Sequence, residues 1–492
     1  MRWVLAAVLG GLAIGAGASA QAAAPTTPQD WRAAAEQDLT AVHDILRDNS
    51  PAAFTDRDSA NFRSWLDVGL SEARAGLPKV VDVRSYLAVM RGYVAGFRDS
   101  HIQWGPTPEA DAPTRSLAWA GFILGRRGDG YEVVYRSPDA ADVPPLHARL
   151  VSCDGLEAET FARSHDRYDG DFSLASGRYY GAARLMQDRG NPFVPRAKRC
   201  TFHLGQTTTN YEIGWREIDA AQQDALNAVL ASPHAKLGLA PWPQRGFWLT
   251  IPTMESNQDW NAFFAAVQAK LTDLREARAL VIDLRGNGGG DSGYAYQLAK
   301  LLWGEALVDQ RAPDLGPTVW RVSKLNREYW ADLTQTTAKD PQVSADSRAS
   351  MRDILKRYDE ALAQGKTTFE ISEDASAKPK AAPPNPMRGR VILLTDEACS
   401  SACLDLMDLF TAMPRTVQVG NVTSADTIFM ELTAVPKLPS GLSAFYFGHK
   451  VWIRRPRGSN QPYAPAIKYT WAGERKDEAG LRAWLATVAS EK

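Results

Sequence analysis

The stretch Leu280–Gly290 reads LVIDLRGNGGG, and its pattern decides the fold class of this chain. Its apolar start has the length and the β-branched residues of a buried strand. The glycines that follow allow positive φ angles and a close approach of the backbone to a neighbouring group. Backbone N–H groups at the end of such a strand can stabilise a developing negative charge. The alternative is that the glycines only form a turn between the strand and a helix.

A second strand-to-helix pattern lies further along the chain. Val391–Thr395 reads VILLT and is a second candidate for a buried strand. The spacing of apolar residues over 404–410 then predicts a helix, with Asp405 and Asp408 on its more exposed side. The two patterns together favour an α/β fold.

Two adjacent serines, Ser400 and Ser401, stand at the junction between this strand and this helix. A serine that projects from a tight turn there has the mechanics of a nucleophile elbow, although the sequence is not GxSxG. A helix N-terminus beside it would also favour a nearby anion. The alternative role for Ser400 is a simple helix cap.

A third informative stretch, Arg91–Ile102, reads RGYVAGFRDSHI and follows an amphipathic segment at Val81–Val94. It puts Ser100 and His101 just after the expected end of that helix. The chain has seven histidines, and a lone histidine more often has a structural role than a catalytic one. The meaning of His101 therefore depends on the other two stretches.

Taken in this order, the three stretches resemble the superfamily of carboxyl-terminal processing (tail-specific) proteases, closest to its tricorn-core and interphotoreceptor retinoid-binding protein-like branch. The resemblance is strongest at Ala279–Gly304 and Val391–Phe410 and runs from about Val81 to the end. It implies a crotonase-like or ClpP-like α/β spiral core, an N-terminal helical region and a PDZ-like β-rich domain. It also implies a serine-type peptidase that needs no cofactor.

The resemblance assigns catalytic roles residue by residue. It implies Ser401 as the nucleophile and His101, preceded by Ser100, as the general base. A lysine base of the bacterial processing branch is not expected, because Asp426 stands at its position with the opposite charge. The oxyanion hole is expected from backbone N–H groups in the glycine loop and after the nucleophile: Gly288, Gly289 and Ala402.

The third catalytic residue stays open. The tricorn-like branch supplies a glutamate downstream, but the matching region, Arg457–Tyr463, contains no acid. Asp426, or the side-chain amide of Asn460 or Gln461, is a candidate to orient the histidine ring, and we place Asp426 slightly ahead of Asn460. A local turn is the alternative role for Asp426.

Length and composition indicate an exported protein of several domains. The chain has 492 residues and a formal net charge of −1, so nothing indicates a nucleic-acid partner. Residues 1–22 read as a bacterial signal peptide, with an uncleaved anchor as the alternative. We expect a periplasmic or secreted protein without a stable membrane span after cleavage, acting on peptides or exported proteins.

The domain boundaries follow from composition and patterning. An insertion at 305–387 interrupts the catalytic core; it holds a predicted helix, Ser347–Gln364, and a linker at 376–386 rich in Ala, Lys and Pro. Such an insert serves as a substrate-selecting lid or as a spacer. The other expected regions are the helical region at 28–110, the PDZ-like domain at 115–220 and the catalytic α/β core at 240–304 and 388–492.

Four cysteines in an exported chain favour disulfide bonds. Of three connectivities, we favour Cys153–Cys200 with Cys399–Cys403, and the second bridge requires Cys399 to lie outside the helix. Buried packing thiols are the alternative. The spacing of cysteines and histidines predicts no metal site.

Two other functions stay open beside the peptidase. The retinoid-binding relatives imply a non-catalytic protein that binds peptides or small hydrophobic molecules on the same fold. The absent lysine and glutamate favour that function, whereas Ser401, His101 and the glycine loop together favour a peptidase. An esterase would use the same machinery.

Overall fold

The computed structural model describes residues 24–113, 116–230, 236–243, 245–340, 343–372, 383–469 and 477–490. The predicted signal peptide and most of the linker at 376–386 lie outside these residues. The chain forms two compact units. We call Ser232–Ile428 with Val451–Lys492 the core unit, and Ala16–Ala231 with Phe429–Lys450 the N-terminal unit.

The core unit is built on a six-stranded sheet with the order β11-β12-β13-β16-β17-β20. Strand β11 runs antiparallel to β12, and every other neighbouring pair is parallel. Both apolar runs predicted from the sequence are strands at the centre of this sheet, β13 and β16. The six strands are β11 (Gly238–Trp242), β12 (Gly246–Thr250), β13 (Ala279–Asp283), β16 (Arg390–Thr395), β17 (Thr416–Gly420) and β20 (Ile467–Lys468).

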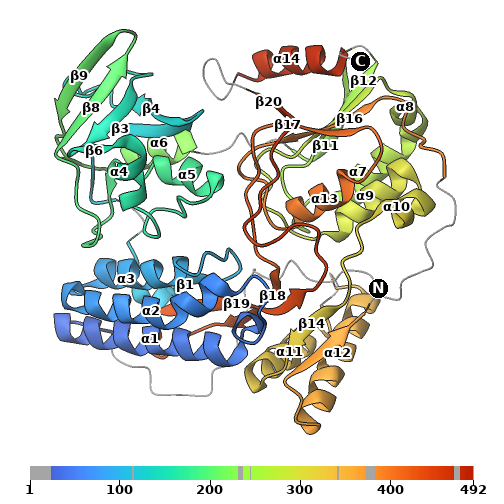
Figure 1. Ribbon diagram of the computed structural model, residues 1–492, viewed down its shortest axis with the longest axis horizontal. Coiled ribbons are helices and arrows are strands. Elements are labelled where there is room, and N and C mark those ends of the chain that lie inside the picture. The colour runs from blue at the N-terminus through green and yellow to red at the C-terminus, as the bar shows by residue number, and fades with distance from the viewer. Residues whose placement is uncertain are drawn as a thin grey trace. The chain divides into compact units, whose positions relative to one another are not determined.

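Helices cover both faces of this sheet, which explains why its central strands are apolar at every position. On one face, Ile282 and Leu393 pack in a core shared with the helices that precede and follow the glycine loop and the two serines. On the other face, Val281 and Ile392 pack against Leu481 of the last helix. Figure 1 shows α14 (Glu478–Ser490) above the sheet, with α7 (Trp260–Ala269), α9 (Gly293–Trp303), α10 (Glu305–Arg311) and α13 (Ala402–Phe410) below it. Helix α8 (Leu271–Glu276) contributes Leu274 to the first of these two cores.

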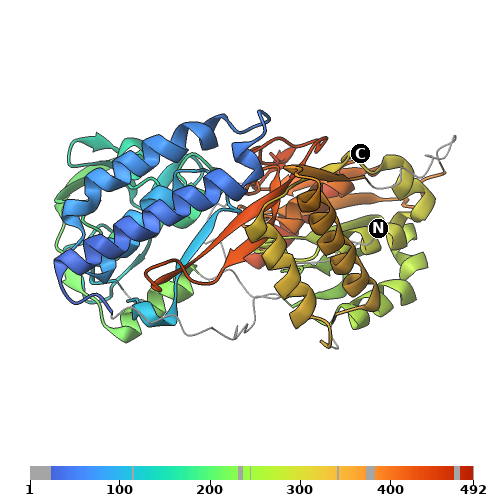
Figure 2. The same ribbon diagram turned by 90° about the horizontal axis from the view of Figure 1, so that it is seen from below.

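The insertion in the core unit has a small core of its own. Helices α11 (Lys324–Thr336) and α12 (Ala345–Ala363) run side by side, as Figure 2 shows, and the second confirms the helix predicted at Ser347–Gln364. Strands β14 (Thr318–Arg321) and β15 (Thr368–Ile371) pair antiparallel beside them. The buried side chains are mainly aromatic: Trp320, Trp330 and Tyr358.

The N-terminal unit begins with a layer of three helices, α1 (Pro28–Asn49), α2 (Ala60–Gly76) and α3 (Val83–Ala95) (Figure 1). A β-rich part follows, whose main sheet has the order β3-β4-β5-β8-β9. The helical region and the β-rich domain expected from the sequence are thus confirmed. The strands of this sheet are β3 (Phe122–Arg127), β4 (Gly130–Arg136), β5 (Arg149–Cys153), β8 (Arg199–Leu204) and β9 (Thr207–Glu212).

Two strands from late in the sequence also enter the N-terminal unit. Strand β18 (Phe429–Val435) pairs with β19 (Ser443–Trp452), and β19 pairs antiparallel with β1 (Gln103–Pro106). The sequence-based boundaries assigned all of 388–492 to the catalytic core, whereas residues 429–450 group with the N-terminal unit. Pairing between strands so distant in the chain leaves no local sequence signal. No helix among the described residues is long and apolar enough to cross a membrane.

Candidate active site

Ser401 stands at a sharp turn between a buried strand and a helix. Strand β16 ends at Thr395 and α13 begins at Ala402. Ser401 has φ 53° and ψ −124°, a conformation that costs free energy for any residue with a Cβ. A serine held in this way at a strand-to-helix turn has the geometry of a nucleophile elbow. The serine is partly exposed, as an attacking hydroxyl must be.

The two adjacent serines differ in their contacts. The Ser400 hydroxyl donates to the carbonyl of Gly288 over 3.0 Å, and its N–H donates to the carbonyl of Asn287. Ser401 makes no side-chain cap to α13, and the contact recorded for the Ser400 hydroxyl is its donation to the Gly288 carbonyl. The structure therefore separates the roles of the serines: Ser400 ties the turn to the glycine loop, and Ser401 occupies the strained position.

The glycine loop lies directly against this turn. A Cβ atom on Gly289 would meet the Cβ of Ser401 at 2.7 Å and the backbone nitrogen of Ala402 at 3.0 Å. Gly289 also has φ 107°, which other residues rarely adopt. Only glycine allows this approach of the loop to Ser401.

A buried asparagine holds the glycine loop in place. Asn287 is fully buried, donates to the carbonyl of Ile251, and accepts from the N–H of Gly289. The N–H of Gly289 is thus already bonded. In the part of the chain that the structure describes, no hydrogen bond engages the N–H of Gly288 or of Ala402. These two donors have the character that an oxyanion hole requires.

Both predicted disulfides form. Cys399 lies in the turn before α13 and bonds to Cys403 in its first turn, with the Cα atoms 5.3 Å apart, so the bridge brackets Ser401. The second bridge joins Cys153 and Cys200, which are register partners on β5 and β8.

His101 lies in the turn between α3 and β1, as the sequence predicted. The residue is 7% exposed, and its backbone N–H donates to a carboxylate oxygen of Asp99. Its buried Nδ1 lies 3.7 Å from the same oxygen, and among the described residues it has no hydrogen-bond partner. Ser100 beside it is exposed. Because His101 belongs to the N-terminal unit and Ser401 to the core unit, their pairing stays a prediction.

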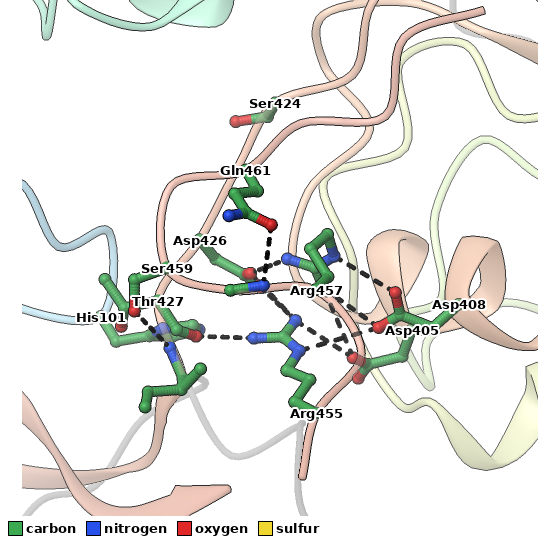
Figure 3. Close-up of polar contacts among 12 residues, drawn as sticks. His101, Asp405, Asp408, Ser424, Asp426, Thr427, Arg455, Arg457, Ser459 and Gln461 are labelled. Carbon is green, nitrogen blue, oxygen red and sulfur yellow. Dashed lines mark hydrogen bonds and ion pairs between the residues drawn. The ribbon is translucent and has the colours of Figure 1, made fainter. Parts of the chain in front are cut away.

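Asp426 lies in a group of buried charges that the sequence did not reveal. Its side chain is 1% exposed, and its two oxygens accept from Arg455 and Arg457, as Figure 3 shows. This is not the local turn considered as the alternative from the sequence. Its backbone carbonyl accepts from the N–H of Asn460 over 2.8 Å. Because two guanidinium groups hold the Asp426 carboxylate, Asn460 becomes the better candidate to orient the histidine.

The same arginines contact two aspartates of α13. Arg457 reaches both oxygens of Asp408 at 3.3 Å, and Arg455 lies 3.4 Å from Asp405 (Figure 3). The side chain of Asp408 is 7% exposed, so placing it on the exposed side of the helix was wrong. We call these residues the buried charge cluster: Asp405, Asp408, Asp426, Arg455 and Arg457.

Burial has the largest effect on the pKa of Asp408. It raises the pKa of Asp408 to about 7, and the carboxylates of Asp405 and Asp426 act in the same direction. Arg457 and the hydroxyl of Tyr463, which donates to Asp408, oppose this increase in the pKa. No group of histidine, cysteine or acidic side chains among the described residues is arranged to hold a metal ion.

A comparison with known protein families finds a match over the part of the chain that contains this candidate site. Residues 248–457 match the family model of peptidase family S41, a span that contains the glycine loop and Ser401 but not His101. No curated protein matches the chain. The solved structure of mature CPAF has a TM-score of 0.58 and 14% identity, covering 93% of this chain and 96% of that chain. Mature CPAF complexed with lactacystin gives a TM-score of 0.59 at 14% identity, covering 93% and 98%. At this identity the likeness shows a shared fold.

Proposed function

We propose that this chain, whose residues 248–457 match the model of peptidase family S41, is a serine peptidase of the carboxyl-terminal processing protease superfamily with Ser401 as its nucleophile. The main support is the strained backbone of Ser401 between β16 and α13, with the glycine loop against it. A structural serine has no need of a conformation that costs free energy.

The proposed reaction begins with attack of the Ser401 hydroxyl on the peptide carbonyl. His101 takes the hydroxyl proton and later gives it to the leaving amine. The N–H groups of Gly288 and Ala402 stabilise the oxyanion, and the N-terminus of α13 adds a favourable dipole. Water then hydrolyses the acyl-enzyme by the reverse use of the same groups.

His101 needs a group that fixes its ring in the correct tautomer. Its buried Nδ1 has no hydrogen-bond partner among the described residues, which leaves it available for such a group. We assign this role to the side chain of Asn460, whose backbone is anchored on Asp426. The backbone carbonyl of Asp426 anchors the N–H of Asn460, and neither Asp426 nor Ser100 takes a proton in this proposal.

The substrate is a peptide or an exported protein. The predicted signal peptide and the two disulfides favour an oxidising compartment outside the cytoplasm, the periplasm or the medium. The β-rich domain of the N-terminal unit is the proposed PDZ-like module. The insertion with α11 and α12 is the proposed substrate-selecting element.

Incubation of the purified protein with casein and with a mixture of unstructured peptides tests the proposal. Mass spectrometry is expected to find new peptide termini with the wild type and with Ser400→Ala, but none with Ser401→Ala. Saturable peptide binding without any cleavage by the folded wild type would overturn the proposal in favour of the binding protein. Cleavage of esters alone would overturn it in favour of an esterase.

A further inference from the structure

The buried charge cluster connects three parts of the site. Asp405 and Asp408 lie on α13, one and two turns after Ser401, and the N–H of Asp405 donates to the Ser401 carbonyl. The backbone carbonyl of Asp426 accepts a hydrogen bond from the N–H of Asn460. The arginines bridge these carboxylates from the segment after β19, which also carries Asn460 three residues beyond Arg457. The nucleophile helix and the segment of the candidate orienting residue therefore share the same two cations.

The cluster also reaches the glycine loop. The hydroxyl of Ser292 donates to Asp405 over 2.6 Å, and Ser292 is the residue before α9, two positions after the last glycine of the loop. One carboxylate of α13 thus holds the end of the loop that supplies the proposed oxyanion donor. Ser401, the glycine loop and the Asn460 segment are therefore each linked to the cluster by a hydrogen bond to Asp405 or Asp426.

The geometry of the arginines is specific. Arg457 approaches Asp408 with two nitrogens at 3.3 Å each and uses its remaining nitrogen for Asp426. Arg455 donates to the carbonyl of Thr427 over 2.6 Å and to Asp426 over 3.1 Å. A planar fork can hold two carboxylates at a fixed separation and angle, which the single ammonium of a lysine cannot do.

Stability alone does not account for such a cluster. Charges buried to this extent lose their hydration, and well-packed apolar residues of similar volume are often equally stabilising. What the ion pairs add is a defined distance and angle between the elements that they join. The exposed fractions of the arginine side chains, 2% for Arg455 and 4% for Arg457, leave little freedom for other arrangements.

We propose that Arg457, supported by Arg455, is a positioning residue that sets the distance between α13, which begins directly after Ser401, and the segment of Asp426, whose backbone carbonyl anchors Asn460. This inference rests on the proposed serine peptidase activity. Arg457 does not touch the substrate. It acts on the rate of the chemical step through Asp408 and Asp426.

The test compares Arg457→Gln with the wild type in two assays. One is hydrolysis of the peptide that the wild type cleaves fastest, resolved into kcat and KM. The other is the second-order rate of labelling by a fluorophosphonate, which reports on Ser401 without peptide binding. We expect kcat and the labelling rate to fall together by at least about tenfold, with KM changed by less than about threefold.

Two further variants give the matched controls. Arg454→Gln removes a neighbouring arginine whose side chain is 59% exposed and paired with Asp314, and it is expected to behave as the wild type. Arg457→Lys retains the charge without the fork and is expected to resemble Arg457→Gln more than the wild type. Full activity of Arg457→Lys would overturn the positioning role, because charge alone would then suffice.

The outcomes separate this inference from the proposed function. A wild type that neither labels nor cleaves refutes the peptidase itself. An active wild type together with a folded Arg457→Gln of unchanged kcat and labelling rate refutes only the positioning role, whatever the change in Tm. If Arg457→Gln does not fold, Asp408→Asn replaces it, since this variant keeps the volume of the side chain while weakening the bidentate contact. Unchanged kcat in Asp408→Asn would then overturn the inference.

Discussion

The Cα atom of Gly289 lies so close to Ser401 that a Cβ on the glycine would sit 2.7 Å from the serine Cβ. Real Cβ atoms do not approach so closely, and the other near neighbours are backbone atoms of Ser400 and Ala402, which cannot move aside like the end of a flexible side chain. This contact explains why the run Gly286–Gly290 has a glycine at position 289: a side chain there would collide with Ser401.

Gly289→Ala should inactivate the enzyme. The added methyl group must displace Ser401 or the Ala402 nitrogen, and it also meets an unfavourable φ of 107°. We expect kcat/KM to fall by at least about a hundredfold, the size of effect seen when an oxyanion donor is lost. Steady-state peptide hydrolysis measures this.

Gly238→Ala on β11 is the matched control for that variant. A Cβ on Gly238 meets only the Lys236 carbonyl, at 3.8 Å, its φ is not in the positive range, and the residue has no part in the proposed catalytic machinery. Activity within about threefold of the wild type is expected. Equal losses in both variants would refute the specific contact between Gly289 and Ser401.

Removal of the two disulfides should have different effects on stability and on activity. Cys153 and Cys200 are 47 residues apart, whereas Cys399 and Cys403 are 4 apart. Loop-closure entropy predicts a loss of about 4 kcal/mol for removing the first bridge and about 2 kcal/mol for the second. The double alanine variants of each pair, compared by thermal unfolding, should therefore show the larger fall in Tm for the first.

Peptidase activity should show the reverse order at a temperature where both variants are folded. The Cys399–Cys403 bridge brackets Ser401, so its loss relaxes the turn that holds the nucleophile. The other bridge lies in the β-rich domain of the N-terminal unit. Unchanged kcat after loss of Cys399–Cys403 would contradict a role for that bridge in the geometry of the elbow.

The sequence was sufficient where the signal is local. Leu280–Ile282 and Val391–Thr395 are buried by helices on both faces, so their apolar runs could be recognised as strands without any partner. The disulfide across Ser401 needed only the spacing of Cys399 and Cys403 and the expected start of the helix.

The buried charge cluster could not be predicted in this way. Asp408 was expected on the exposed side of α13 because helical periodicity classifies a charge by its own helix alone. Its partner Arg457 comes from 49 residues further along. For the same reason, the entry of β18 and β19 into the N-terminal unit was missed, since a strand carries no record of a distant pairing partner.

Asp408 should make stability depend on pH in a defined direction. Burial, with the nearby carboxylates of Asp405 and Asp426, raises its pKa from 3.8 to about 7 in the folded state, against the opposing effects of Arg457 and Tyr463. Between these values the folded protein holds a proton that the unfolded chain has lost. The contribution of Asp408 to the free energy of unfolding therefore falls as pH rises from about 4 to 7 and then levels off.

Urea denaturation of wild type and Asp408→Asn across this range measures the contribution of Asp408 and its coupling within the buried charge cluster by difference, because titrating groups outside the cluster affect both proteins alike. The stability of the variant relative to the wild type should increase from pH 4 to pH 7. A difference that is constant with pH would show that Asp408 titrates as an ordinary carboxyl, and a change in the opposite direction would show that its pKa is lowered; either result would contradict the prediction.

The most direct test of Ser401 as an activated nucleophile is labelling of the purified protein with a fluorophosphonate, followed by intact-mass analysis. Wild type and Ser400→Ala should each gain one label, whereas Ser401→Ala and His101→Ala should gain none, because the nucleophile or its base is missing. Labelling of Ser401→Ala, or a folded wild type that stays unlabelled, would contradict the assignment of Ser401 as the catalytic serine.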